Sequence, residues 1–272
     1  MIGFFDSGFG GLTVMKDVVR LLPRYDYLYL GDNARIPYGT RSAGIVFEFT
    51  RQAVDYLFKR GCPLIIVACN TASAAALRRI QQEHLPAAWP GRRVLGVVRP
   101  AAEAIVEKGC RRVGILATEG VVESGSYPVE VHKLDPTVEI VQQACPILVP
   151  IVEAGEQEWK TADVAVAAYV KMLLSRNDGL DTILLACTHY PVLMPIFRQH
   201  IPDRISILEQ GPLVAEKLKD YLERHRWIEE RISRNGERIF CTTDRNERFD
   251  RLARLFYGAP VTSTMVRLGD NL

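Results

Sequence analysis

The chain of 272 residues contains no stretch that approaches the roughly 20 uninterrupted apolar residues needed to cross a bilayer. Its first residues reach Asp6 without a basic leader or a long apolar core, so we expect no secretory signal peptide. The formal net charge is only +2, which gives no reason to expect nucleic acid or a membrane as the main partner. We therefore expect a protein of the cytoplasm.

Metal-binding and nucleotide-binding patterns are absent as well. The six cysteines contain no C-x-x-C pair, and the histidines form no cluster, so we expect reduced thiols and no metal site. The glycine-rich turn Asp6–Gly11 matches neither G-x-G-x-x-G nor a P-loop. Converging backbone N–H groups at this turn favour a carboxylate over a nucleotide. The alternative is an ordinary strand-to-helix turn that Asp6 or Ser7 caps.

What the sequence does contain is an alternation of strand and helix patterns. Strands are expected at 2–5 and 25–30 and in the run that ends at Cys69, and helices at 12–22, 42–60 and 72–84. Such alternation predicts right-handed βαβ units and a mainly parallel sheet, hence an α/β fold.

The pattern then repeats. The segment Val113–Thr118 aligns with Ile2–Ser7, and the strand that ends at Cys187 aligns with the one that ends at Cys69, at nearly the same offset. We infer two similar α/β lobes, each a mainly parallel sheet flanked by helices, related by pseudo-twofold symmetry with the active site in the cleft between them.

The expected boundaries place 1–94 plus 208–272 in the first lobe and 95–207 in the second. The junction is expected near Pro86–Gly96, where proline and glycine interrupt the periodicity. A strand at 205–208 and a helix at 212–226 are expected to return the chain to the first lobe. The mixed-sign charges of 217–248 are interpreted as a solvated surface.

Two strands end in matching motifs, Ile65–Thr71 and Ile183–His189, each with an Ala-Cys pair followed by polar residues. The carboxyl ends of parallel strands are where open α/β sheets bind ligands. Cysteine often only fills space in a core, and that interpretation holds for either residue alone. The matching contexts instead indicate one site with Cys69 and Cys187 on opposite sides, each before a helix or turn whose dipole favours the thiolate.

Two thiols on opposite faces of a substrate suit inversion of a stereocentre, because one base removes a proton and the other acid returns it. His189 is close enough in sequence to share a proton network with Cys187, although a lone histidine is as often a surface or capping residue. Glu153 is only weakly indicated by sequence. The remaining cysteines are interpreted as structural: Cys62, Cys110, Cys145 and Cys241.

Four stretches in this order resemble the glutamate racemases of the cofactor-independent aspartate/glutamate racemase superfamily: Phe5–Val14, Ala34–Gly39, Ala68–Ser73 and Cys187–Pro191. The resemblance covers nearly the whole chain. It implies interconversion of L- and D-glutamate by Cys69 and Cys187 without a cofactor, with D-glutamate destined for peptidoglycan. It also implies a homodimer with glutamate as its small-molecule partner.

The resemblance further assigns roles to single residues. Asp6 would assist Cys69, whereas Glu153 and His189 would assist Cys187. The implied substrate contacts are Asp6, Ser7, Tyr38, Gly39, Asn70, Thr71, Thr188 and His189.

Two positions depart from the pattern, because many members of that family have Glu at Arg99 and Asp-Ser at Glu209–Gln210. They leave regulation and lobe packing open. Three rival functions also stay open: a sister racemase for aspartate or hydantoins, a two-lobed binding protein without chemistry, and a protein-binding side role such as inhibition of a DNA-processing enzyme.

Overall fold

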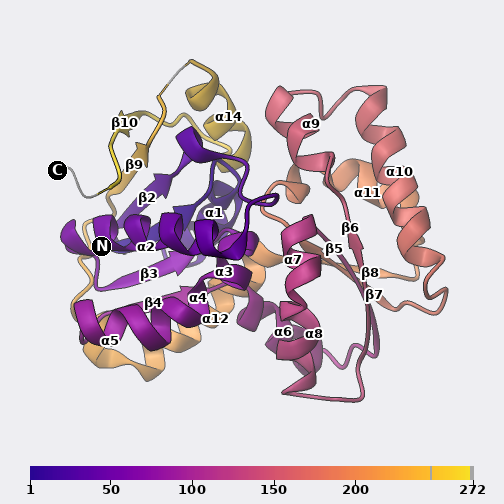
Figure 1. Cartoon of the computed structure of the whole chain (residues 1–272), viewed down its shortest axis with the longest axis horizontal. Coiled ribbons are helices and arrows are strands. Elements are labelled where there is room, and N and C mark those ends of the chain that lie inside the picture. The colour runs from indigo at the N-terminus through magenta and orange to yellow at the C-terminus, as the bar shows by residue number, and fades with distance from the viewer. Residues whose placement is uncertain (246, 270–272) are drawn as a thin grey trace.

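The computed structural model describes residues 1–245 and 247–269. Two parallel β-sheets, each flanked by helices, form two lobes that lie side by side (Figure 1). This arrangement confirms the expected two-lobed α/β fold. Residues 246 and 270–272 lie outside the described residues. The sequence analysis assigned all four to the first lobe, and residue 246 also to the charged surface stretch.

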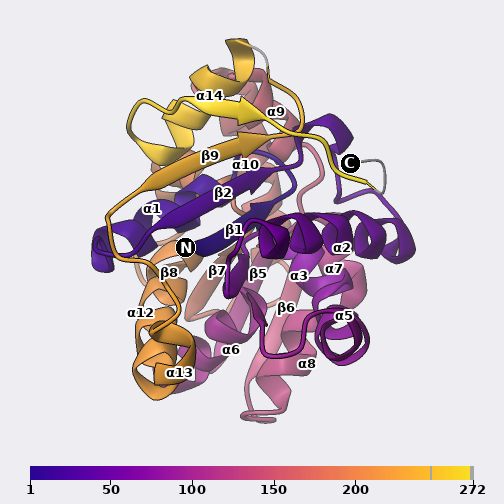
Figure 2. The same cartoon turned by 90° about the vertical axis from the view of Figure 1, so that its left-hand side faces the viewer.

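The first sheet has the strand order β10-β9-β2-β1-β3-β4, with every pair parallel. Figure 2 shows β9, β2 and β1 side by side in this sheet. Its strands are β1 (Ile2–Asp6), β2 (Tyr27–Gly31), β3 (Leu64–Val67), β4 (Arg93–Gly96), β9 (Arg238–Thr242) and β10 (Ser263–Met265). All residues of β1, β2 and β3 are buried, as expected for strands covered on both faces. Its helices are α1 (Gly11–Leu21), α2 (Ala43–Lys59), α3 (Asn70–Ala75), α4 (Leu77–Arg79), α5 (Leu85–Ala88), α12 (Gln210–Arg224), α13 (Arg226–Glu229) and α14 (Glu247–Tyr257).

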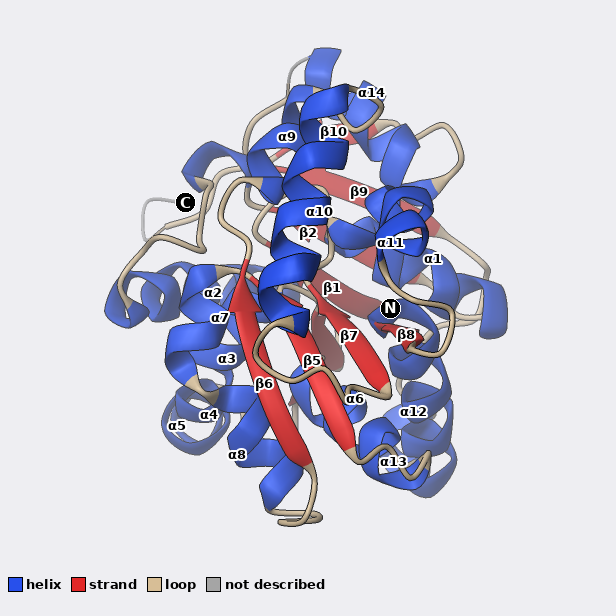
Figure 3. Cartoon of the chain, turned by 90° about the vertical axis from the view of Figure 1, so that its right-hand side faces the viewer, coloured by secondary structure: helices blue, strands red, loops and turns tan. Residues whose placement is uncertain are grey.

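The second sheet has the order β6-β5-β7-β8 and is also parallel throughout (Figure 3). Its strands are β5 (Arg112–Ala117), β6 (Glu139–Ala144), β7 (Thr182–Ala186) and β8 (Ser206–Glu209). The helices around it are α6 (Val98–Glu107), α7 (Glu119–Ser124), α8 (Ser126–His132), α9 (Leu148–Ala154), α10 (Lys160–Leu174) and α11 (Met194–His200).

The two sheets repeat one topology. The order β2-β1-β3-β4 in the first corresponds to β6-β5-β7-β8 in the second, so β5 takes the place of β1 and β7 that of β3. The internal repeat in the sequence predicted this correspondence of β5 with β1 and of β7 with β3. As a result, Cys69 after β3 and Cys187 after β7 occupy equivalent places in the two lobes.

Two strands lie across the expected boundaries. The strand β4 pairs with β3, so the chain leaves the first sheet only after Gly96. The strand expected at 205–208 does not return to the first lobe, because β8 pairs with β7 in the second sheet. The chain returns afterwards, through α12, whose buried face packs against α1. A hydrophobic run predicts a strand but does not identify the neighbour with which it pairs.

Two local predictions were also wrong. The helix expected at 72–84 begins at Asn70 and is interrupted at Ala76, whose φ of −117° is far from helical values, before a π-helical turn at Ile80–His84. The stretch 217–248 is not all surface, because it contains the sheet strand β9 and the buried carboxylate of Glu229, which Arg24 and Arg234 neutralise.

One hydrophobic cluster runs through both lobes and includes buried side chains of α1, α12 and β7. The lobes are therefore joined by a continuous core rather than by a flexible linker alone. Among the described residues, no helix is long and apolar enough to cross a membrane.

Candidate active site

Cys69 lies at the end of β3 as the N-cap residue of α3. Its thiol donates to Ser7 Oγ at 3.4 Å and accepts from the backbone N–H of Ala72 at the same distance. Only 6% of the residue is exposed. The structure thus brings Cys69 and Ser7, one of the substrate contacts that the resemblance implies, together.

The charge state of Cys69 differs from the expectation. Burial, followed by the nearby carboxylate of Asp6, raises the pKa of the Cys69 thiol to about 12, even though Ser7 and the Ala72 N–H lower it. The N–H of Ala72 at the start of α3 acts in the expected direction, towards the thiolate, but desolvation and a like charge outweigh it. At neutral pH this raised pKa favours the protonated thiol of Cys69.

Cys187 has different surroundings. It follows β7, and its Sγ lies 3.9 Å from Nδ1 of His189. The other ring nitrogen, Nε2, lies 3.1 Å from Oε1 of Glu153 on α9. The contacts therefore connect the thiol to the imidazole and the imidazole to the carboxylate. Glu153, which the sequence indicated only weakly, is part of this group.

His189 is the group of these three whose pKa favours a positive charge. Burial disfavours the charged ring, but hydrogen bonding to Cys187 and Glu153 prevails and raises the pKa of His189 to about 10. An imidazolium beside Cys187 Sγ is the partner that a thiolate requires. The ring also packs edge-on against Phe256 of α14, with 5.1 Å between centroids, so its orientation is fixed.

Asp6 joins the two halves of the site. It is completely buried and accepts from the N–H of Gly8 at 2.9 Å and from Thr188 Oγ of the second lobe at 3.5 Å. Burial raises the pKa of Asp6, and the charge of His189 opposes that shift. The residue predicted to assist the first thiol therefore also interacts with the second-lobe residues beside Cys187.

The close approach of the lobes requires a glycine at position 10. A Cβ atom there would lie 2.2 Å from Oγ of Thr188 and 2.6 Å from Nδ1 of His189. The φ of Gly10 is −58°, which any residue adopts, so the requirement is space and not backbone freedom.

The loop of Tyr38 and Gly39 lies across from α7. The hydroxyl of Tyr38 donates to Asp32 at 2.5 Å, so this phenol is directed at the first lobe's own framework. The carbonyl of Gly39 instead accepts from the N–H of Gly120 in the second lobe at 3.1 Å. Gly39 is thus an inter-lobe contact through its backbone.

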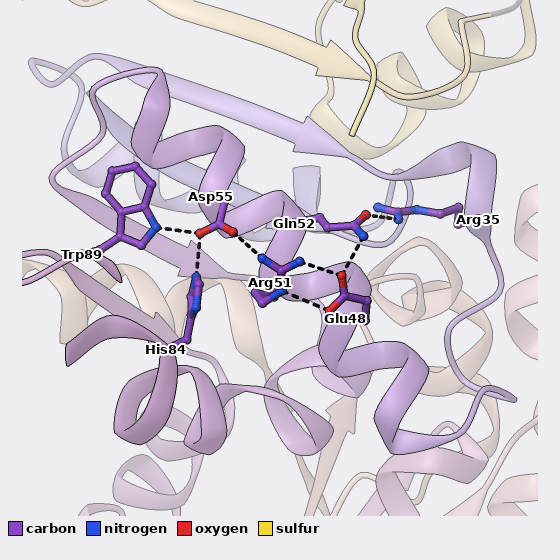
Figure 4. Close-up of polar contacts among 7 residues, drawn as sticks. All are labelled: Arg35, Glu48, Arg51, Gln52, Asp55, His84 and Trp89. Atoms are coloured by element: carbon purple, nitrogen blue, oxygen red, sulfur yellow. Dashed lines mark hydrogen bonds and ion pairs between the residues drawn. The ribbon is translucent and has the colours of Figure 1, made fainter. Parts of the chain in front are cut away.

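A polar network along α2 anchors this loop (Figure 4). Arg35 connects the loop to α2, because it donates to Asp32, the partner of Tyr38, at 2.7 Å and to Gln52 of α2 at 2.6 Å. The network continues to Asp55, which accepts from His84 and Trp89. Its members are Arg35, Glu48, Arg51, Gln52, Asp55, His84 and Trp89.

The sequence missed Thr118, which directly follows β5. Its hydroxyl lies 3.1 Å from that of Thr71, across the boundary between the lobes. The signal was present, because the internal repeat aligns Thr118 with Ser7. Gln210 and Tyr127, whose side chains bind Asn70, were also missed, and no motif indicates them.

The departure at Arg99 lies away from both thiols. Arg99 forms ion pairs with Glu103 at 2.9 Å and with Glu130 at 3.3 Å. It lines a cavity of about 720 Å³ among helices α3, α4, α6, α8 and α12, and neither Cys69 nor Cys187 lines this cavity.

All six cysteines are free. Within residues 1–245 and 247–269, no group of three or more His, Cys, Asp or Glu side chains is arranged to hold a metal ion.

Comparison with known proteins identifies the class. The chain is 31% identical to a glutamate racemase isoform of Bacillus anthracis, with a TM-score of 0.88 over 98% of this chain and 97% of that one. The glutamate racemase of Francisella tularensis, solved in complex with D-glutamate, gives a TM-score of 0.87 at 27% identity, over 98% and 97%. The protein is an isomerase, an amino-acid racemase.

The family follows from sequence. A model of the Asp/Glu/hydantoin racemases matches residues 2–217. The glutamate racemase of Ruegeria pomeroyi is 40% identical over 235 residues, which cover 82% of this chain and 86% of that protein. That of Lactiplantibacillus plantarum is 35% identical over 261 residues, covering 95% and 92%. The chain belongs to the Asp/Glu/hydantoin racemase family.

Proposed function

We propose that this racemase interconverts L- and D-glutamate without a cofactor, with Cys69 and Cys187 as the two bases. The observation that carries the proposal is the difference between their surroundings. Cys69 is buried near Asp6, which raises the pKa of its thiol to about 12, whereas Cys187 Sγ lies 3.9 Å from Nδ1 of His189, whose pKa is raised to about 10. A two-base reaction requires this starting condition, one base and one acid at the same time.

In the proposed reaction, the thiolate of Cys187 removes the α-proton from one face of the substrate. The thiol of Cys69 delivers its own proton to the opposite face, which inverts the stereocentre. The enzyme is left with Cys187 protonated and Cys69 as a thiolate, the form that reacts with the other enantiomer. His189 and Glu153 stabilise the first charge state. In the second, the Ala72 N–H donates to Cys69 Sγ, and the Ser7 hydroxyl, which accepts from the thiol, turns to donate to the thiolate.

The substrate is bound by hydroxyl and backbone groups around the thiols. We assign this role to Asp6, Ser7, Gly39, Asn70, Thr71, Thr188 and His189, with Thr118 added and Tyr38 contributing through its backbone. Fixed donors around a developing carbanion contribute several kcal/mol of transition-state stabilisation in typical enzymes, because they need no reorganisation.

Glutamate is the proposed substrate because the relatives that cover most of the chain are glutamate racemases, and one of them was solved with D-glutamate. The test is proton NMR in D₂O with L-glutamate, D-glutamate and L-aspartate. Loss of the α-proton signal from both glutamate enantiomers, with optical rotation decaying to zero, is expected. Exchange with aspartate alone would move the substrate to a sister family, and no exchange with any of them would contradict the proposal.

The cellular role follows from the product. We propose that the enzyme acts in the cytoplasm as a homodimer and supplies D-glutamate for peptidoglycan, with two domains that divide after β4 at Gly96 and after β8 at Glu209. Rescue of a D-glutamate auxotroph by the wild-type gene, and its loss with Cys187→Ser, would test the role. Light scattering would test the dimer.

A further inference from the structure

Three buried side chains from both lobes meet directly beside Cys69. Asn70 is the first residue of α3, and Gln210 is the first residue of α12, immediately after β8 of the second sheet. Tyr127 comes from α8 of the second lobe. Their exposed fractions are 3%, 3% and 0%, so the cluster is closed to solvent.

The two amides bind each other in both directions. Asn70 Nδ2 donates to Gln210 Oε1 at 2.5 Å, and Gln210 Nε2 donates to Asn70 Oδ1 at 2.8 Å. The hydroxyl of Tyr127 donates to the same Oδ1 at 2.6 Å, and Gln210 Nε2 also donates toward that hydroxyl. A reciprocal amide pair forms at only one distance and one orientation, so it fixes geometry as well as contributing energy.

This geometry matters because Asn70 is covalently next to Cys69. The direct polar contacts of the Cys69 thiol, to Ser7 and to the Ala72 N–H, are both 3.4 Å long and involve sulfur, a weak hydrogen-bonding atom. The side chain of the next residue, Asn70, is held by shorter contacts, in the amide pair with Gln210, and Gln210 directly follows β8 of the second sheet. Asn70 still keeps one N–H beyond the one it donates to Gln210.

We propose that Gln210 is a positioning residue: its amide pair with Asn70, closed by Tyr127, holds the Cys69 turn in register with the second lobe. The proposal rests on the two-thiol function proposed above. It also gives a role to the position where this chain departs from the Asp-Ser of its resemblance. The amide of Gln210 offers a donor and an acceptor on separate atoms, and the reciprocal pair with Asn70 uses both.

The test compares Gln210→Met with the control Gln143→Met. Methionine keeps the volume of glutamine but can neither donate nor accept in the pair. Gln143 of β6 is buried to a similar degree, with 5% exposed, and its amide donates to the carbonyl of its own neighbour, Ala144, rather than across the lobes. Both variants are assayed for kcat and KM in both directions, and for the rates at which iodoacetamide labels Cys69 and Cys187 in the free enzyme.

For Gln210→Met we expect kcat to fall about 10- to 100-fold, since a displacement of about 1 Å at a catalytic group can cost about 100-fold. KM should change less than about threefold, and the labelling of Cys69 should accelerate at least about fivefold relative to that of Cys187. The control should match wild type in every measurement. A kcat within twofold of wild type, or equal acceleration at both thiols, would overturn the proposal, because equal acceleration indicates general loosening.

A second variant covers the case in which Gln210→Met does not fold. Tyr127→Phe removes one hydroxyl from the cluster, and we expect a smaller loss of kcat, about 3- to 10-fold, with the same selective acceleration at Cys69. Unchanged kcat and unchanged labelling would refute the role of the cluster. Labelling needs no substrate, so it judges Gln210 separately, whereas a wild-type enzyme that fails to racemise glutamate would refute the proposed function.

Discussion

Replacing Gly10 by alanine is expected to disrupt the site directly, because Gly10 lies where the first lobe contacts Thr188 and His189. The added Cβ would be 2.2 Å from Thr188 Oγ and 2.6 Å from His189 Nδ1, whereas ordinary contacts begin at 3.4 Å. Helical backbone at Gly10 suits alanine, so the effect comes from space alone.

The size of the effect follows from how little the neighbours can move. Reaching ordinary contact requires a shift of about 1 Å, yet Thr188 and His189 are only 5% and 4% exposed, and Phe256 and Glu153 hold the His189 ring. Overpacking of this kind costs about 1–3 kcal/mol of stability. A shift of about 1 Å beside a base costs about 100-fold in rate. We expect Gly10→Ala to lower kcat/KM about 100-fold while the protein stays folded.

The assay is polarimetry from both enantiomers of glutamate, together with urea unfolding. Gly44→Ala is the matched control, because a Cβ at Gly44 on α2 would meet nothing within 4 Å. That variant should keep wild-type kcat/KM and gain up to about 1 kcal/mol of stability from its helix. A Gly10→Ala enzyme with kcat/KM within threefold of wild type would refute the steric reasoning, and equal losses in both variants would show that the effect is not local.

Three further predictions concern the thiols, the histidine and the tyrosine. Either Cys69→Ser or Cys187→Ser should nearly abolish racemisation while the circular dichroism spectrum stays unchanged; wild-type rates in both directions would exclude the two-base reaction. Because the pKa of His189 is raised to about 10, above its unfolded value of about 6.5, its stabilisation is complete below pH 6.5 and is lost as pH rises toward 10. The urea midpoint should therefore fall over that range, and a His189→Asn variant that falls as steeply would contradict this origin. Tyr38→Phe should cost about 1–3 kcal/mol of stability through the lost bond to Asp32, with kcat/KM within threefold; a large kcat/KM loss would show that the phenol acts on the substrate.

The sequence predicted the architecture because its signals were local and repeated. Buried strands such as β1 and β3 are nearly continuous hydrophobic runs, and the second half repeats their order. It did not predict which sheet β8 joins, because pairing depends on neighbours far away in the chain. It also missed the burial of Glu229, since a run of mixed charges does not reveal a carboxylate enclosed by two arginines.

For the site, motifs brought the right regions together but not all their contacts. In the structure His189 contacts both Cys187 and Glu153, although Glu153 had little support from sequence alone. Gln210 and Tyr127 contact Asn70 from distant segments, with no shared motif. Such contacts arise only when two lobes pack, so no pattern within either lobe predicts them.

The protonation state of the site depends on both lobes as well. The two lobes place their cysteines at equivalent strand ends, yet the groups around the two thiols differ. The difference comes from what each lobe adds: the carboxylate of Asp6 near Cys69, and the imidazolium of His189 beside Cys187. The proposed two-base reaction needs bases placed symmetrically, because its substrates are mirror images, and an asymmetric charge, because one thiol must be deprotonated while the other is protonated. The repeated fold provides the first, and the unrepeated residues Asp6 and His189 provide the second.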